Sequence, residues 1–155
     1  MKDEIPRPPT LLAFPSYLAT KVARIGYRFF SAALADHDID TARFAVLAAL
    51  SDFGALAQRE LADRLDVNQS HLVGYVDELE RRELVKRKRD PSDRRRQLVE
   101  LTPKGRHLLG SLVTSAQRAE DDFLQALSER ERRTFTTLLH RILRADDHTR
   151  LNPRT

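Results

Sequence analysis

The chain of 155 residues contains no cysteine. This absence excludes disulfide bonds, thiolate metal sites and redox sensing by a thiol. Long apolar runs are lacking too, and none approaches the length that crosses a membrane. The first nine residues, MKDEIPRPP, place acids and prolines where a signal peptide needs an apolar segment. We therefore expect a cytoplasmic protein that makes no contact with a membrane.

Sequence motifs for catalysis are also lacking. The chain has no glycine-rich phosphate loop and no nucleophile beside a general base. His37, His107, His140 and His148 show no paired helical spacing, and the DHD cluster at residues 36–38 is isolated in a loop. Histidines that face solvent or lie at helix ends explain this pattern better than a metal site does. We expect no enzymatic activity, no metal and no cofactor.

Charge is plentiful and unevenly distributed. The 27 basic and 23 acidic residues leave a net charge of only +4, yet seven Lys or Arg residues lie between Lys86 and Arg96, against Asp90 and Asp93. Two short runs, residues 84–89 and 96–101, have the composition of a β-hairpin, and the Asp-Pro-Ser-Asp sequence between them favours a turn. A projecting hairpin of this charge has the chemistry to lie along a phosphate backbone.

Apolar periodicity predicts six helices around this hairpin. They cover residues 16–35, 41–53, 58–65, 69–82, 103–126 and a segment that begins after Ser128. Asp40 or Thr41, Asn68, Thr102 and Ser128 have the side chains that cap helix N-termini. Residues 1–15 hold four of the seven prolines and are expected to form no regular element, and the last ten residues are expected to fray.

The predicted fold class is mainly α with a small β-hairpin wing. A helix–turn–helix followed directly by a hairpin is a winged helix, which we assign to residues 40–102. The helices at 16–36 and 103–146 carry more apolar surface than one small domain can cover, so we expect them to pair with a second copy of the chain. Residues 1–15 are then an N-terminal arm and residues 147–155 a C-terminal tail.

The block from Gln58 to Gly105 resembles the winged-helix core of the MarR family of bacterial transcriptional regulators. The resemblance is carried by Glu-Leu-Ala at 60–62, Asp-Glu-Leu-Glu at 77–80, Asp-Pro-Ser-Asp-Arg-Arg at 90–95 and Leu-Thr-Pro-Lys-Gly at 101–105. It implies an obligate homodimer that binds a pseudo-palindromic operator and is released by a small ligand or an oxidant. Such regulators are most often repressors.

The chain departs from the family pattern at four positions. Glu83 and Asp66 stand where glycine is common, and Ala57 replaces a Ser or Thr cap. Gly74 occupies the exposed face of the recognition helix, where a long polar residue is frequent. The first three departures affect stability, and the fourth affects how bases are read.

Residues 69–82 form the predicted recognition helix, which enters the major groove by its N-terminus. Gln69, Ser70 and His71 are the candidate base readers, Val73 can contact a thymine methyl, and Gly74 allows close approach of the backbone. The alternative is that these residues merely begin an exposed helix.

At the wing, Arg95 is the candidate for insertion into the minor groove. The resemblance implies that Asp93 orients it through a salt bridge. Four further cations are candidate phosphate contacts: Lys86, Lys88, Arg94 and Arg96. The alternative is a charged hairpin that is only solvated.

The resemblance also places a ligand pocket between the dimerisation helices and the winged domain. A small aromatic or phenolic ligand would draw on six residues there: Tyr17, Tyr27, Phe30, His37, Arg43 and Phe44. Core packing explains the aromatic side chains equally well.

Two functions fit these observations. The first is a sequence-specific, dimeric transcriptional regulator of double-stranded DNA. The second is a winged-helix dimer whose wing binds protein, or binds DNA without sequence preference, as an architectural factor does. The second should show salt-sensitive affinity and no preferred site.

Overall fold

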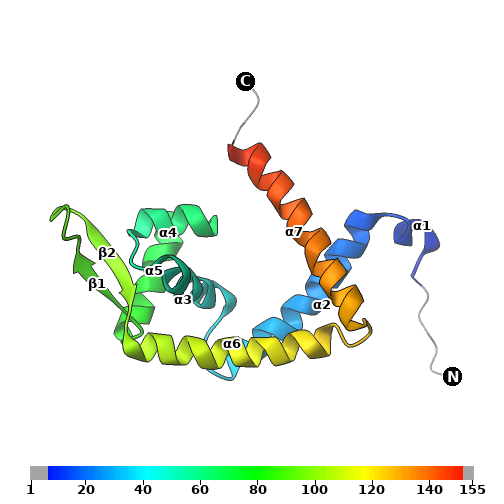
Figure 1. The fold of residues 1–155 in the computed structure, drawn as a ribbon, viewed down its shortest axis with the longest axis horizontal. Coiled ribbons are helices and arrows are strands. Elements are labelled where there is room, and N and C mark those ends of the chain that lie inside the picture. The colour runs from blue at the N-terminus through cyan, green and yellow to red at the C-terminus, as the bar shows by residue number, and fades with distance from the viewer. Residues whose placement is uncertain (1–6, 152–155) are drawn as a thin grey trace. The chain divides into compact units, whose positions relative to one another are not determined.

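The computed structural model describes residues 7–151, with side chains up to residue 147. The chain divides into two compact units, Met1–Glu120 and Asp121–Thr155. The elements follow in the order α1 (Pro9–Leu12), α2 (Pro15–Ala35), α3 (Thr41–Phe53), α4 (Gln58–Leu65), α5 (Gln69–Arg81), β1 (Val85–Arg89), β2 (Gln97–Leu101), α6 (Pro103–Phe123) and α7 (Glu129–Leu151) (Figure 1). The predicted class, mainly helical with one hairpin, is confirmed.

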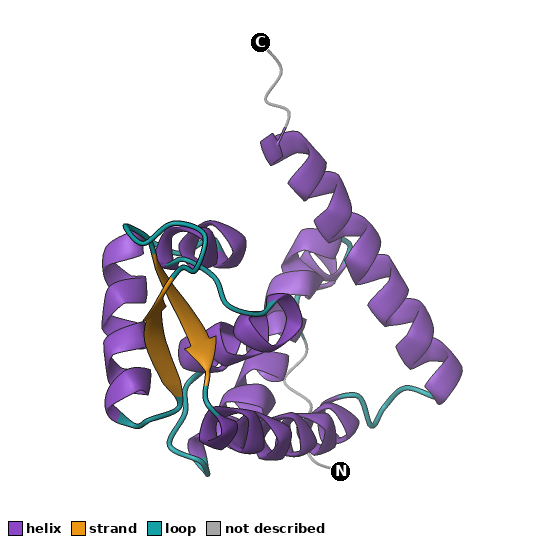
Figure 2. Ribbon diagram, turned by 60° about the vertical axis from the view of Figure 1, so that its left-hand side comes forward, coloured by secondary structure: helices purple, strands orange, loops and turns teal. Residues whose placement is uncertain are grey.

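Strands β1 and β2 form an antiparallel hairpin in which Val85 faces Leu101 and Arg89 faces Gln97 (Figure 2). A short bridge joins the hairpin to the segment before α4, where the N–H of Val99 donates to the carbonyl of Leu56 over 2.8 Å. The wing is therefore bonded to the helix–turn–helix through backbone groups as well as through side chains.

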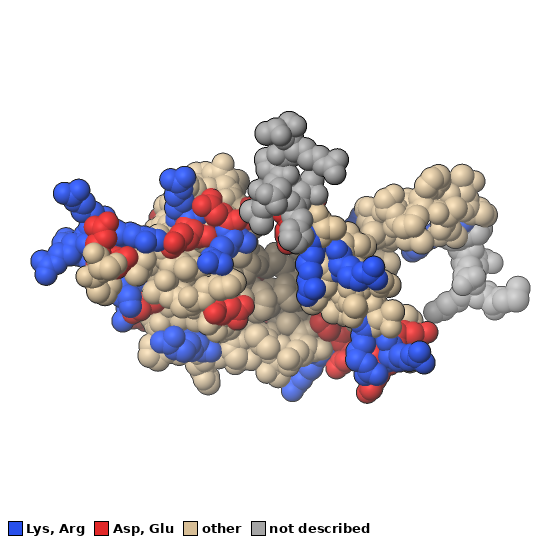
Figure 3. All heavy atoms as spheres, turned by 45° about the horizontal axis from the view of Figure 1, so that its top comes forward, with Lys and Arg blue, Asp and Glu red and all other residues tan. Residues whose placement is uncertain are grey.

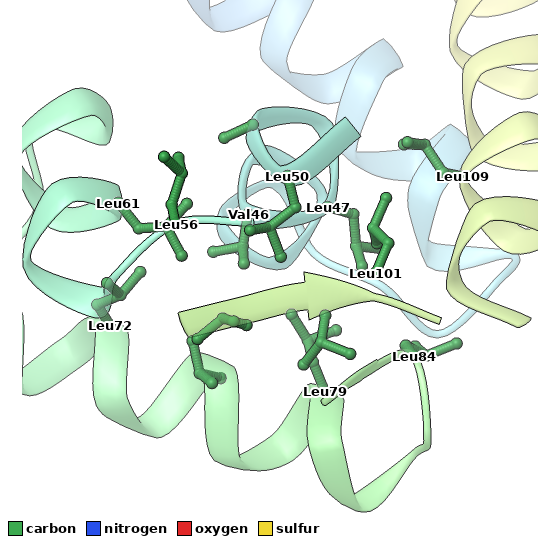
Figure 4. Close-up of a cluster of buried hydrophobic side chains, with 14 of the residues drawn as sticks. Val46, Leu47, Leu50, Leu56, Leu61, Leu72, Leu79, Leu84, Leu101 and Leu109 are labelled. Atoms are coloured by element: carbon green, nitrogen blue, oxygen red, sulfur yellow. The ribbon is translucent and has the colours of Figure 1, made fainter. Parts of the chain in front are cut away.

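The core of the first unit lies where α3, α4, α5 and the hairpin meet (Figure 4). Leu61 of α4 and Leu47 of α3 are fully buried, as are Leu72 and Leu79 on the inward stripe of α5. Full burial of each such side chain is worth roughly 1.5–3 kcal/mol. This packing fixes which face of α5 is left for solvent.

The predicted helix starts are confirmed by hydrogen bonds. The side chain of Asp40 accepts from the N–H of Arg43 over 2.8 Å, and that of Asn68 accepts from Ser70 over the same distance. At α6 the Thr102 hydroxyl accepts from Gly105 over 3.0 Å, and at α7 Ser128 and Glu131 form the predicted capping box. At α4, Ala57 supplies no side-chain cap, but its own N–H donates to the carboxylate of Glu60.

Two of the departures from the family pattern lie at strained backbone positions. Asp66 and Glu83 have φ of 52° and 61°, in the left-handed region that favours glycine. Gly105 is required for a different reason, since a Cβ there would lie 2.0 Å from the carbonyl oxygen of Leu84. The Leu-Thr-Pro-Lys-Gly motif thus places the first turn of α6 against the backbone of Leu84, between the recognition helix and β1.

The structure corrects three boundaries. Residues 9–12 form a helical turn, because Pro9 at the first helical position has the φ that a helix requires, so residues 7–15 are not without regular structure. Helix α6 ends at Phe123 rather than residue 126, and α7 continues to Leu151, past the predicted end at 146. Our expectations for residues 1–6 and 152–155 lie outside the described residues.

Helices α2 and α7 leave apolar surface uncovered. Leu34 is the buried residue of α2, while Tyr27 is 60% exposed. Between Glu129 and Asp147 no side chain of α7 is buried, and a stripe of four apolar residues is exposed: Leu138, Leu139, Ile142 and Leu143. Within the described part of the chain, no helix combines the length and the apolarity that are needed to span a bilayer.

Candidate nucleic-acid interface

The first turn of α5 projects into solvent. Gln69, Ser70 and His71 are all exposed, and Val73 is 42% exposed. The Ser70 hydroxyl donates to the Asn68 carboxamide oxygen over 2.7 Å, which holds Ser70 in one orientation and leaves its oxygen free to accept. The predicted base-reading residues therefore share one exposed helix end.

Gly74 lies one turn further along the same face. A Cβ built there would find no atom within 4 Å. Packing therefore does not require glycine at this position. Because Gly74 has no side chain, a partner can approach the helix backbone closely there.

Most wing cations are engaged in ion pairs with carboxylates. Lys86 and Lys88 both pair with Glu100, the first over 3.1 Å. Arg96 pairs with Glu60 of α4 over 2.7 Å and lies 3.9 Å from Asp90. The hydrogen bond from Lys88 is the main cause of a lowered pKa at Glu100. Three of the four candidate phosphate contacts thus have intramolecular partners.

Arg87 joins the wing to the helix–turn–helix, a role the sequence analysis missed. Its guanidinium pairs with Glu80 and, over 2.5 Å, with Asp77, and it also donates to Gln58 over 3.0 Å. Burial alone would lower the pKa of Arg87, but the bonds to Asp77 and Glu80 outweigh it and raise the pKa. The signal was present in strand alternation, which directs Arg87 to the side opposite Lys86.

The tip of the wing is ordered by two aspartates. The Asp90 carboxylate accepts from the hydroxyl and the N–H of Ser92 over 2.7 and 2.8 Å, and these bonds lower its pKa. Asp93 accepts from the backbone N–H of Arg95 over 3.0 Å. The described residues show no ion pair between Asp93 and the Arg95 guanidinium, so the expected salt bridge is corrected to a bond that shapes the backbone.

Three wing arginines remain without an ion pair among the described residues: Arg89, Arg94 and Arg95. All three are exposed. Figure 3 shows basic side chains projecting from the wing end of the first unit. Arg89 was not singled out from the sequence; it faces Gln97 across the hairpin, whereas Lys86 and Lys88 both pair with Glu100.

The six candidate ligand residues do not converge on one site. Phe30 and Phe44 meet edge to face with ring centroids 5.4 Å apart and pack against the core. Tyr27 lines a separate hollow with Lys21, Arg24 and Arg28 of its own helix, and the Tyr17 ring lies under the Lys21 ammonium. The aromatic side chains are explained by packing and local contacts.

The remaining two candidates lie at the connection between α2 and α3. The His37 ring is 3.0 Å from the Ser115 hydroxyl of α6, and Arg43 pairs with Asp40 and with Glu78 of α5. A hollow of about 370 Å³ borders Arg43, Asp38 and Glu78. The described residues contain no group of three or more side chains suited to hold a metal ion.

These features define a winged helix–turn–helix protein with an exposed recognition helix and a basic wing. A model of the MarR family matches residues 39–96. The HTH-type transcriptional repressor NicR from Pseudomonas putida is 34% identical over 113 residues, covering 73% of this chain and 72% of NicR. The chain belongs to the MarR family and is a transcriptional regulator rather than an enzyme.

Solved structures support the same assignment. A mutant MarR from Escherichia coli complexed with operator DNA aligns with a TM-score of 0.73 at 26% identity, covering 83% of this chain and 92% of the other. Bordetella bronchiseptica BpsR, whose DNA binding is regulated by 6-hydroxynicotinic acid, aligns with a TM-score of 0.71 at 29% identity, covering 82% and 96%.

Proposed function

We propose that this regulator is a cytoplasmic, ligand-responsive repressor that binds a pseudo-palindromic operator as a homodimer. The observation that carries the proposal is the exposed, capped start of α5 beside a wing whose tip holds unpaired arginines. An operator complex of a structurally similar MarR protein gives further support.

In this proposal α5 enters the major groove. Gln69, Ser70 and His71 read base edges, Val73 contacts a thymine methyl, and the low surface at Gly74 lets the backbone approach. Their shared exposure supports this role, since the opposite face of α5 is buried in the core.

The wing then reaches the minor groove, where Arg95 inserts and Arg94 contacts phosphate. Asp93 holds the backbone of Arg95 in the geometry that presents the guanidinium. Lys86, Lys88 and Arg96 also contact phosphates, but each must share or leave a carboxylate to do so. Their contribution per residue should therefore be smaller than that of the tip arginines.

Dimerisation uses the helices at 16–36 and 103–146. The exposed stripe of α7, with Ile142 at 68% and Leu143 at 61%, supports this proposal, because apolar surface of this extent on a soluble domain marks an interaction site. A second copy carries the same stripe, so the two can pair by a twofold axis.

The ligand in this proposal is a small aromatic or phenolic acid. BpsR, which responds to 6-hydroxynicotinic acid, supports the ligand class. In this proposal the carboxylate of the ligand displaces Asp40 or Glu78 from the Arg43 guanidinium, which borders the hollow, and His37 lies in the same connection. Addition of such acids to the operator complex should release the DNA; no release by any of a panel would count against this part.

Selection of bound sites from a random duplex library at near-physiological salt tests the proposal. Recovery of an inverted repeat with half-sites about one helical turn apart is the expected result. Tight, salt-sensitive binding without a recovered motif would overturn it in favour of an architectural DNA-binding protein.

A further inference from the structure

Residues 36–40, which connect α2 to α3, are bonded to the end of the recognition helix. Arg82 follows the last residue of α5, and its guanidinium donates to the carbonyl oxygen of Asp38 over 2.6 Å and to that of His37 over 3.4 Å. The segment leaves α2 through Asp38, whose φ of 55° turns the chain away from the helix. Arg82 thus donates hydrogen bonds to the carbonyls of His37 and Asp38, which lie beyond the end of α2 and have no partner within that helix.

The same segment has two further attachments. Arg43 joins Asp40 to Glu78, which lies on α5 one turn before Arg82. The ring of His37 bonds with Ser115 of α6 over 3.0 Å. The backbone carbonyl of Arg82 itself accepts from Lys104 of α6 over 2.9 Å. Arg82 therefore lies where the α2–α3 connection, α5 and α6 meet.

We propose that Arg82 is a positioning residue that fixes the orientation of the recognition helix relative to α2. The inference rests on the dimer proposed above, in which α2 contributes to the dimer contact. A change in the angle between α5 and α2 would then alter the distance between the two recognition helices. Arg82 thereby determines which half-site spacing the dimer accepts.

The lever arm of α5 makes this effect large enough to measure. Thirteen residues span about 20 Å of helix at 1.5 Å per residue. A rotation of about 5° in each protomer displaces each base-reading end by about 1.7 Å, so the separation of the two ends changes by about 3.4 Å, which is the rise of one base pair. Loss of the Arg82 bonds should therefore relax spacing by about one base pair.

The test compares three duplexes carrying the selected operator: one with its native spacing, one with a base pair added or removed between half-sites, and one with a single half-site. We expect the wild-type protein to prefer native over altered spacing by about tenfold or more, as for one misplaced set of base contacts. Arg82→Ala should reduce that preference to within about threefold while keeping single half-site affinity. Arg82→Lys, which retains one donor, should restore part of the preference.

Arg64→Ala is the matched control, because the Arg64 guanidinium lies 4.2 Å from the centre of the Phe53 ring and, among the described residues, has no hydrogen bond or ion pair to residues 36–40. It should leave spacing preference unchanged.

An equal loss of affinity for all three duplexes in Arg82→Ala, with an unchanged preference, would overturn the inference. If Arg82→Ala does not fold, Arg82→Lys decides: an unaltered preference overturns the inference and a weakened one supports it. A wild-type protein without any spacing preference would instead refute the proposed dimeric operator binding.

Discussion

Removal of the two tip arginines should lower the salt dependence of DNA binding more than removal of any paired wing cation. Arg94 and Arg95 have no carboxylate partner among the described residues, so contact with DNA, at a phosphate or in the minor groove, costs them no ion pair. Arg96 must give up bonds to Glu60 and Asp90 for the same contact. Each tip arginine should therefore release more counterions on binding than a paired wing cation does.

The magnitude follows from counterion release. Each phosphate charge neutralised by a protein cation, whether the cation lies at a phosphate or in the minor groove, contributes about 0.9 to the slope of log K against log salt concentration. A dimer has two wings, so Arg95→Ala should reduce the slope by about 1.8, and the Arg94→Ala/Arg95→Ala double variant by about 3.6. Between 50 and 200 mM salt the double variant should therefore lose about 150-fold less affinity than the wild-type protein does.

Fluorescence anisotropy with the selected operator, over a series of salt concentrations, measures these slopes. Arg96→Ala serves as the comparison, and we expect less than half of the Arg95→Ala change. An equal change for Arg95→Ala and Arg96→Ala would show that the intramolecular ion pairs do not restrict the wing, and would refute the reasoning.

Three further predictions concern stability and assembly. Gly105→Ala should lower the free energy of unfolding in denaturant titration by about 1–3 kcal/mol, because its Cβ would collide with the Leu84 carbonyl. Gly110→Ala is the control and should raise the free energy of unfolding by about 0.5–1 kcal/mol, because no atom lies within 4 Å of its Cβ. Equal effects of the two substitutions would contradict this prediction. Because the pKa values of Glu100 and Asp90 are lowered in the folded protein, these carboxylates stabilise it fully above their ordinary pKa values of 4.5 and 3.8, and this stabilisation is lost as pH falls through the lowered pKa values. Glu100→Gln should therefore make the free energy of unfolding depend less on pH in acid. An unchanged pH profile for this variant would exclude the role of Glu100. Ile142→Glu should shift the protein from dimer to monomer in analytical ultracentrifugation. Thr137→Glu, at an exposed polar position of α7, should leave the dimer intact. If the Ile142→Glu protein stays dimeric, the α7 stripe is not part of the dimer interface.

Much of the fold could be predicted because its determinants are local. Asp40, Asn68, Thr102 and Ser128 cap the helices that their positions predicted. The spacing of Leu72, Val76 and Leu79 predicted the buried face of α5, and with it the exposed face that carries Gln69 to Gly74. Capping and amphipathic periodicity act within one or two turns of helix, so a single sequence contains them.

The tertiary structure decided which charges are available. The sequence shows seven cations in the wing, but Arg87 pairs with Asp77 and Glu80, and Arg96 pairs with Glu60, 36 residues away. Arg82 reaches the carbonyl of Asp38, 44 residues away. Partners this distant meet only after the core has packed, so neither composition nor periodicity can name them. The sequence by itself therefore determined the winged-helix elements and the exposed face of α5, and the folded core determined which arginines hold the molecule together and which face outward.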